Sequence, residues 1–280
     1  MMQLRVVHVT GFEYAGRAAA SYNQARLTPL TSAMQIVIHH RVEVSPHPWI
    51  YDYTDYFGTR VTAFEVAEPH SSLTVTATST VQVSRPPAGW PELDWADLDS
   101  PEVADRWTEY LVQPDLVAPP ADFASESRAI ATSAARPALA AREICALVHS
   151  AVEYAPGATD VKTSASEVWN QRAGISQDMV HLAIGGLRSA GIPARYVSGY
   201  SHPSSDPRIG ETLRGNSHAW LEFWDGSWKP FDPTNASEPG DTYVAVAKGR
   251  DYTDVRPLDG IYSGAQTSEM TAYVDITRLV

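Results

Sequence analysis

Residues 172–200 read RAGISQDMVHLAIGGLRSAGIPARYVSGY, and this stretch decides the fold of the 280-residue chain. Apolar residues follow Ser176 at helical spacing, and the run ARYVSGY after Pro193 is typical of a strand. The pattern therefore predicts a helix from Ser176 to Ala190, followed by a strand. Ser176 stands at the amino end of that helix.

The amino end of a helix is a favourable position for a nucleophile. Its free N–H groups and the positive end of the helix dipole stabilise negative charge, so they lower the pKa of a thiol and support a developing oxyanion. Serine is also a common N-cap residue with a purely structural role. From this segment alone, Ser176 is either a nucleophile or a helix cap.

A second signal lies in HAWLEFWDGSWKPFDP, which begins at His218. Two strand-like runs flank the Asp225-Gly226 pair, and this predicts an antiparallel hairpin with a two-residue turn. Facing residues of such a hairpin have numbers that sum to about 451, so we expect His218 nearly opposite Asp232 or Pro233.

Opposed side chains on one face of a hairpin are about 5 Å apart at Cβ. The carboxylate of Asp232 can therefore accept a hydrogen bond from the imidazole of His218, which fixes the tautomer and leaves the other ring nitrogen free as a base. Each residue alone is more often structural at a strand end. Together with Ser176, however, they complete the nucleophile, base and orienting group that covalent acyl transfer needs.

The rest of the chain divides by pattern. Residues 3–84 alternate with many β-branched positions and predict a β-rich region, whereas residues 84–95 hold three prolines and a glycine and predict a linker. Helices follow, and a mobile loop is expected over residues 200–217. The predicted regions are a β-rich N-terminal region (1–90), a connector (91–135), a catalytic core (136–235) and C-terminal strands that pack back on the sheets (236–280).

Composition excludes several partners. The formal net charge of −12, without clustered Lys and Arg, disfavours nucleic acid and anionic membrane surfaces. No stretch approaches the roughly 20 apolar residues of a membrane helix. The first residues read as a strand and not as a secretory signal, so we expect a soluble cytoplasmic protein. The sequence does not indicate an oligomeric state.

The cysteine and histidine content predicts neither a metal site nor a cofactor. A single cysteine, Cys145, excludes an internal disulfide and a cysteine-rich zinc or iron–sulfur site. It lies on a predicted helix, where a small buried hydrophobic role is expected. His39 and His40 point to opposite faces of a strand, and neither HExxH nor CxxC occurs.

Several of these segments, in order, resemble bacterial transglutaminase-like proteins, which are relatives of papain-type cysteine peptidases. The core motifs are GISQDMVHLAIGGLRSAGIPARYVSGY, NSHAWLEFWDGSWKPFDPTN and VAKGRDYTDVRPLDGIYSG, and segments such as LRVVHVTGFEY and DYFGTRVTAFEVAEPHSSLTVTATSTV resemble the N-terminal region. The resemblance implies an α+β fold. Its papain-like core packs a helix on an antiparallel sheet, beside an N-terminal β-sandwich-like region.

The resemblance also implies an activity. Family members use a Cys-His-Asp triad that attacks an amide or thioester carbonyl and transfers the acyl group to water or an amine. His218 matches the base and Asp232 the orienting group, whereas Ser176 stands where the family has cysteine. The implied partners are a peptide, a protein or a small amide or amine.

Four neighbouring residues are candidates for substrate or oxyanion support. Gln177 and Asp178 lie on the first helical turn, where Asp178 alternatively only complements the helix dipole. Trp169 and Trp220 could line an acyl-donor groove, and core packing is the alternative for both.

Serine at position 176 leaves three explanations open. A cysteine was replaced by mutagenesis to silence the enzyme, or the chain is a natural serine-type amidase, or it is a pseudoenzyme that keeps the cleft for peptide binding. An alcohol reacts only if His218 removes its proton during attack. We therefore expect activity about 10³-fold below that of a Ser176→Cys form.

Overall fold

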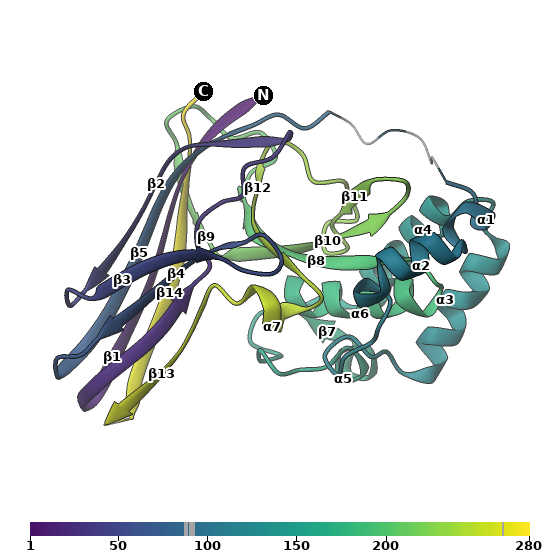
Figure 1. The fold of residues 1–280 in the computed structure, drawn as a ribbon. Coiled ribbons are helices and arrows are strands. Elements are labelled where there is room, and N and C mark those ends of the chain that lie inside the picture. The colour runs from purple at the N-terminus through teal and green to yellow at the C-terminus, as the bar shows by residue number, and fades with distance from the viewer. Residues whose placement is uncertain (87–88, 90–92, 265) are drawn as a thin grey trace.

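The computed structural model describes residues 1–280 except 87–88, 90–92 and 265. Long strands occupy one end of the molecule, helices occupy the other, and a smaller sheet lies between them (Figure 1). The two chain ends meet at one edge, where the backbone N–H of Leu279 donates to the carbonyl of Gln3 at 2.7 Å. The predicted α+β fold is confirmed.

The large sheet is built on one long strand. β1 (Met2–Ala25) pairs antiparallel with β5 (His70–Val83) and, in its second half, with β4 (Arg60–Val66). β2 (Gln35–Ser45) extends the β5 side, and β3 (Trp49–Thr54) extends the β4 side. These strands follow the period-two pattern of the sequence. Residues 87–88 and 90–92 of the predicted linker lie outside the described residues.

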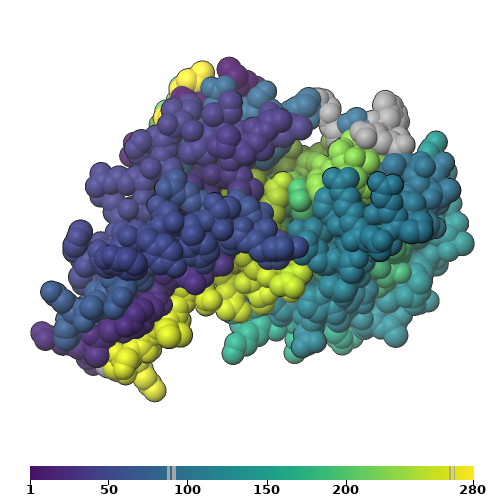
Figure 2. All heavy atoms as spheres, in the orientation of Figure 1, coloured from purple at the N-terminus to yellow at the C-terminus, as the bar shows by residue number. Residues whose placement is uncertain are grey.

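The C-terminal part of the chain completes this sheet. β14 (Thr267–Arg278) pairs with the first half of β1, and β13 (Leu258–Gly264) pairs with its second half. In Figure 2 the yellow C-terminal residues lie along the lower edge of the purple strands and extend toward the teal helical part. Among the residues that the structure describes, the sheet has eight strands, and the smaller sheet supplies the layer that packs on it.

One loop prediction was wrong in part. Residues 200–217 were expected to form a mobile loop, but Thr212–Gly215 forms β9, which pairs with β14. The guanidinium of Arg214 donates two hydrogen bonds to the carboxylate of Asp275, at 2.8 and 3.0 Å. The segment that leads into His218 is therefore attached to the large sheet, because cross-strand pairing outweighs the turn-forming composition.

The smaller sheet carries the candidate site. Its antiparallel strands lie in the order β11 (Trp228–Phe231), β10 (Ser217–Trp224), β8 (Ala194–Ser201) and β12 (Tyr243–Gly249). The N-terminal end of the large sheet packs against it through Leu4 and Val6, which share a cluster with Tyr200 and Val244. β8 and β12 are thereby packed against the large sheet.

Helices cover the other face of the smaller sheet (Figure 1). The longer ones are α3 (Ala121–Ser133), α4 (Pro137–Ala151), α5 (Ala165–Gln171) and α6 (Ser176–Ser189). Short elements connect and flank them: α1 (Trp95–Leu98), α2 (Pro101–Arg106), the 3-10 turn η1 (Thr108–Tyr110), α7 (Tyr252–Val255), and the two-residue strands β6 (Glu153–Tyr154) and β7 (Ala173–Gly174).

α6 is the central helix, since every residue from Ser176 to Arg188 is buried. Gly186 brings it close to its neighbours, because an added Cβ would lie 2.8 Å from the ring of Phe123 and 2.9 Å from Ile144. α6 runs antiparallel to β8, as Arg188 near the helix end donates to the carbonyl of Ala194 at the strand start.

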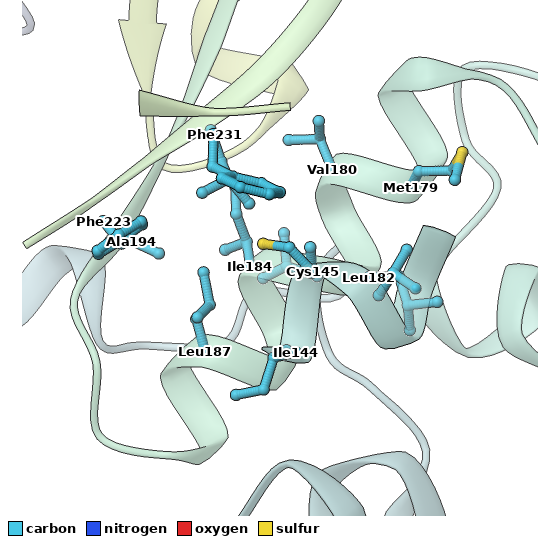
Figure 3. Close-up of a cluster of buried hydrophobic side chains, with 14 of the residues drawn as sticks. Ile144, Cys145, Met179, Val180, Leu182, Ile184, Leu187, Ala194, Phe223 and Phe231 are labelled. Carbon is cyan, nitrogen blue, oxygen red and sulfur yellow. The ribbon is translucent and has the colours of Figure 1, made fainter. Parts of the chain in front are cut away.

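Cys145 of α4 lies in the core, with Ile184 of α6 and Phe231 of β11 nearby (Figure 3). Burial raises the pKa of its thiol, and the charge of Asp232 raises it further. This confirms the expected role of Cys145 as a small buried hydrophobic residue. Within the described part of the chain, no helix is long and apolar enough to cross a membrane.

Gly199→Ala should destabilise the protein by about 2–3 kcal/mol, because overpacking a close contact forces the neighbours apart. A Cβ on Gly199 would lie 2.1 Å from the carbonyl oxygen of Val244 and 2.7 Å from the indole of Trp220. Urea denaturation measures the effect. The control is Gly240→Ala, since Gly240 has open space at that position. Equal effects of the two variants would contradict the packing described for β8.

Candidate active site

Ser176 is the first residue of α6 and not its cap. The N-cap is Ile175, which has extended backbone dihedrals of φ −107° and ψ −178°. The carboxylate of Asp178 accepts a hydrogen bond from the backbone N–H of Ile175 at 2.8 Å and so supplies the capping contact. The N-cap alternative for Ser176 is therefore wrong, and its hydroxyl is not used to stabilise the helix start.

Asp178 secures the first turn of α6. Its Oδ2 atom also accepts from the hydroxyl of Thr159 at 2.6 Å, which ties the preceding loop to the helix start. Burial raises the pKa of Asp178, against the lowering effect of the hydrogen bonds from Ile175 and Thr159. Its contacts are those of a residue that holds the helix start in place.

His218 and Asp232 meet at the other side of the site. The Nε2 atom of His218 lies 2.7 Å from Oδ2 of Asp232, within hydrogen-bonding distance. His218 stands near the start of β10, and Asp232 follows directly after β11. The predicted proximity of the two side chains is confirmed.

The predicted hairpin register was wrong by one. The observed pairs include Leu221 with Phe231 and Trp224 with Trp228, so three residues, not two, separate the strands at the turn. β11 ends at Phe231, and Asp232 lies beyond the ladder. Its side chain reaches His218 from a turn and not from a facing strand position.

That turn is stabilised by Asp232 itself. Its backbone exchanges two hydrogen bonds with Ser237, at 2.8 and 3.3 Å. Its Oδ1 atom accepts from the backbone N–H groups of Thr234 at 2.8 Å and Asn235 at 3.3 Å, as in an Asx turn. The local backbone therefore orients the carboxylate of Asp232 independently of its contact with His218.

Asp232 is fully buried, and three donors share its Oδ2 atom. These are His218 Nε2, the amide of Asn235 at 2.7 Å and the hydroxyl of Tyr243 at 2.8 Å. Burial raises the pKa of this carboxyl group, but the hydrogen bonds from His218, Tyr243 and Asn235 outweigh burial and hold the pKa below its ordinary value. Asp232 is consequently an anion at neutral pH.

Two aromatic rings fix the plane of His218. The indole of Trp220 lies stacked at 6.5 Å between ring centroids, and the ring of Tyr243 makes an edge contact at 5.8 Å. With Nε2 engaged by Asp232, the Nδ1 atom is the remaining proton acceptor. No hydrogen bond to Nδ1 is found among the described residues.

The crossing of α6 over β8 indicates how far along the sheet Ser176 lies. The rings of His181 and Tyr196, with centroids 5.3 Å apart, mark where α6 crosses β8. From His181 back to Ser176 the helix advances about 7.5 Å, which equals two to three residues along β8. This distance leads from Tyr196 to Gly199, which is the cross-strand partner of His218.

The gap between the Ser176 side chain and His218 is not bridged by a hydrogen bond in the described chain. Within the described chain, no hydrogen bond joins the hydroxyl of Ser176 to His218, and Ser176 is 6% exposed. Catalytic hydrogen bonds are often long in a free enzyme and tighten when substrate binds.

The four supporting candidates have different surroundings. Gln177 is buried beside Ser176, and its amide nitrogen has no hydrogen-bond partner in the described chain. Trp220 lies against His218. Trp169 instead packs α5 against α3, where its indole N–H donates to Asp122 and its ring contacts Phe123 and Arg172. These contacts occupy Trp169, so the core-packing alternative describes it.

Two residues of the site were missed from the sequence. Asn235 was within the quoted DPTN motif, and Asx-turn chemistry was the signal that could have identified it. The sequence gives no signal that Tyr243 belongs to the site, because it fits the strand pattern of β12 like its apolar neighbours. As for metals, the described residues contain no group of three or more His, Cys, Asp or Glu side chains arranged to hold an ion.

Comparisons with known proteins identify the relatives of this chain. Residues 125–233 match the model of the transglutaminase-like superfamily, and residues 4–82 match that of the bacterial transglutaminase-like N-terminal region. The uncharacterized protein ML0607 of Mycobacterium leprae (strain TN) is 44% identical over 280 residues, which is the whole of both chains. The uncharacterized protein Rv2569c of Mycobacterium tuberculosis is 33% identical over 295 residues, covering 97% of this chain and 91% of the relative.

One solved structure is similar over the full length of the chain. It comes from Cytophaga hutchinsonii and is named a "Putative Cysteine Protease". The TM-score is 0.77 with 22% sequence identity, and the alignment covers 100% of this chain and 91% of the other. At this identity the likeness concerns the fold.

Asp232→Asn should destabilise the protein by about 3 kcal/mol at neutral pH, because an amide cannot serve all the donors around the carboxylate. Since the folded protein lowers the pKa of Asp232, its stabilisation is present above the ordinary aspartate value and is lost as the pH falls through the folded value. Urea denaturation from pH 7 downward should show the difference between the two proteins shrinking. A difference that does not change with pH would contradict this account.

Proposed function

The chain belongs to the transglutaminase-like superfamily, and we propose that it performs acyl transfer or amide or isopeptide hydrolysis through residue 176. The acyl donor is a peptide, a protein or a small amide, and the acceptor is water or an amine. The observation that carries the proposal is the hydrogen bond between His218 Nε2 and the buried carboxylate of Asp232. It leaves Nδ1 as the base, level with Ser176.

In the proposed reaction, Ser176, His218 and Asp232 each have one role in every step. His218 Nδ1 accepts the proton of the Ser176 hydroxyl as its oxygen attacks the carbonyl carbon, and Asp232 stabilises the imidazolium that forms. The tetrahedral oxyanion then collapses, and His218 returns the proton to the leaving amine. Water or an acceptor amine cleaves the acyl-enzyme by the same steps in reverse, which releases the product and restores the hydroxyl.

The oxyanion has two proposed sources of support. Free N–H groups of the first turn of α6 would donate to the oxyanion, and the helix dipole would add to their effect. Gln177 follows Ser176 on that turn, and its buried amide nitrogen has no partner within the described residues. A buried N–H donor without a partner is costly, and an oxyanion would satisfy it.

Serine makes the proposed reaction slow. A thiol at the start of α6 beside His218 would ionise before attack, whereas an alcohol requires full base catalysis in the transition state. Cysteine also has the longer bond to the attacked carbon, so a site built for it holds serine too far from the carbonyl. We therefore propose strongly reduced activity for the Ser176 form.

A second candidate is a pseudoenzyme that binds a peptide or a Gln or Lys side chain without turnover. The serine at position 176 and the open contact between its hydroxyl and His218 favour this alternative. In that case His218 and Asp232 preserve the structure of the site and carry out no proton transfer.

Ser176→Cys should gain activity by about 10³-fold or more over the Ser176 protein, because the thiol removes the need for full base catalysis. Mass spectrometry with amide and thioester donors should detect a covalent acyl adduct on the variant and release of the amine or thiol. A panel of donors that yields neither would favour the pseudoenzyme.

In the Ser176→Cys background, His218→Ala should abolish most of this gain, by about 10³-fold, since the general base is lost. The matched control is His39→Ala, because His39 is exposed on β2. Unchanged turnover after His218→Ala would show that His218 is not the base.

Gln177→Ala in the same background should lower kcat by about 10²-fold with a small change in KM, because an oxyanion donor acts mainly in the transition state. Gln171→Ala is the control, since Gln171 is an exposed residue of α5 whose amide donates to the carbonyl of Ala173. Steady-state kinetics on the fastest donor measures both. Equal kcat values for the two variants would exclude Gln177 from oxyanion support.

A further inference from the structure

The carboxylate of Asp232 accepts more hydrogen bonds than the one that joins it to His218. One oxygen, Oδ2, lies within hydrogen-bonding distance of His218 Nε2 at 2.7 Å, Asn235 Nδ2 at 2.7 Å and Tyr243 Oη at 2.8 Å. Asn235 Nδ2 is also 3.1 Å from Tyr243 Oη, so these two side chains contact each other as well. The Oδ2 atom of Asp232, which orients His218, is thus part of a hydrogen-bond network with Asn235 and Tyr243.

Tyr243 reaches this oxygen from a distant strand. It lies at the start of β12, whereas Asp232 follows β11 at the opposite edge of the same sheet. The strand between β12 and β10 carries Gly199 opposite His218, and a Cβ there would collide with Trp220. The absence of a side chain at Gly199 gives the aromatic rings room to lie across the sheet.

The ring of Tyr243 is itself held on two sides. It makes edge contacts with Trp220 at 5.4 Å and with His218 at 5.8 Å between ring centroids. Tyr243 is 7% exposed. Because burial leaves no competing water, its hydroxyl keeps the hydrogen bond to Asp232, and burial raises the pKa of Tyr243 to about 12, so it remains a donor.

We infer that Tyr243, assisted by Asn235, is a positioning residue that locks the carboxylate of Asp232 in the one orientation that directs Nδ1 of His218 toward residue 176. A carboxylate is free to rotate about its terminal bond unless both oxygens are engaged. Backbone N–H groups hold Oδ1, and Tyr243 and Asn235 hold Oδ2 in the plane that His218 needs. The inference rests on the proposed function.

The match to the superfamily model does not reach these two residues. The match to the superfamily model ends at residue 233, so Asn235 and Tyr243 both lie beyond it. Tyr243 also begins the strand that pairs with β8 and carries Val244, which packs against the large sheet. The strand that carries Tyr243 is thus also part of the contact between the two sheets.

The test compares Tyr243→Phe with Tyr200→Phe. The first removes the hydroxyl from Asp232 and keeps the ring. The second removes a buried hydroxyl of the same sheet, which is 3.0 Å from His8 Nδ1, and so matches the loss of one buried hydrogen bond. Both are made in the Ser176→Cys protein for kinetics and in the Ser176 protein for proton NMR of the histidine imidazoles.

In the Ser176→Cys protein, Tyr243→Phe should lower kcat about tenfold with KM nearly unchanged, since one hydrogen bond that orients the base is lost. Tyr200→Phe should leave kcat unchanged. In the Ser176 protein, the far-downfield imidazole proton of the bond from His218 to Asp232 should shift or broaden in Tyr243→Phe and stay in place in Tyr200→Phe.

An unchanged kcat together with an unchanged imidazole proton in Tyr243→Phe would overturn the inference. If the Ser176→Cys protein shows no turnover with any donor, the proposed function fails, and the NMR signal alone decides the positioning role. Should Tyr243→Phe not fold, Asn235→Ala removes the second donor at a partly exposed position. It is expected to shift the same proton and to lower kcat about threefold, and no effect on either would count against the inference.

Discussion

The buried carboxylate of Asp232 is the feature on which the site depends. Burying an unpaired carboxylate costs several kcal/mol, and here backbone N–H groups, an amide, a hydroxyl and an imidazole offset that cost. These donors come from β10, β12 and the turn after β11. Because one anion requires all of them, the relative positions of three segments of the smaller sheet are fixed together.

The packing of α6 supplies the other half of the site. This helix is buried over almost its whole length, so its amino end cannot shift without opening the core. Asp178, and not the hydroxyl of Ser176, caps that end. The large sheet contributes from outside: β9 attaches the segment before His218, and the cluster around Leu4 and Tyr200 holds β8 and β12. His218 and the start of α6 are thus each held in place by buried contacts.

Much of this arrangement could be predicted from local pattern. The start of α6 and the strands that carry His218 and Asp232 follow from helical spacing, alternation and turn residues. The partnership of His218 with Asp232 was also predictable, although the register was wrong by one, because a three-residue turn replaced the expected two-residue one. Turn geometry at Asp225 depends on tertiary contacts that the dipeptide alone does not contain.

Other features depend on contacts that are remote in the sequence. β9 forms because Arg214 and its neighbours pair with β14, more than 50 residues away, and the run of Pro, Ser and Gly around it conceals that strand. Tyr243 enters the site from β12 across a glycine of β8, which no pattern within β12 indicates. Trp169 was a candidate for the groove by proximity in sequence, but Asp122 and Phe123 occupy it in the helical core.

The most direct test of the central claim, that His218 and Asp232 act on residue 176, is the pH dependence of iodoacetamide alkylation of the Ser176→Cys protein. Cys145 is buried, so the Ser176 protein gives the background. The account predicts rapid alkylation well below the ordinary thiol pKa of about 8.5, and a shift toward that value when His218 is replaced by alanine. Alkylation that follows an ordinary thiol and is indifferent to His218 would contradict it.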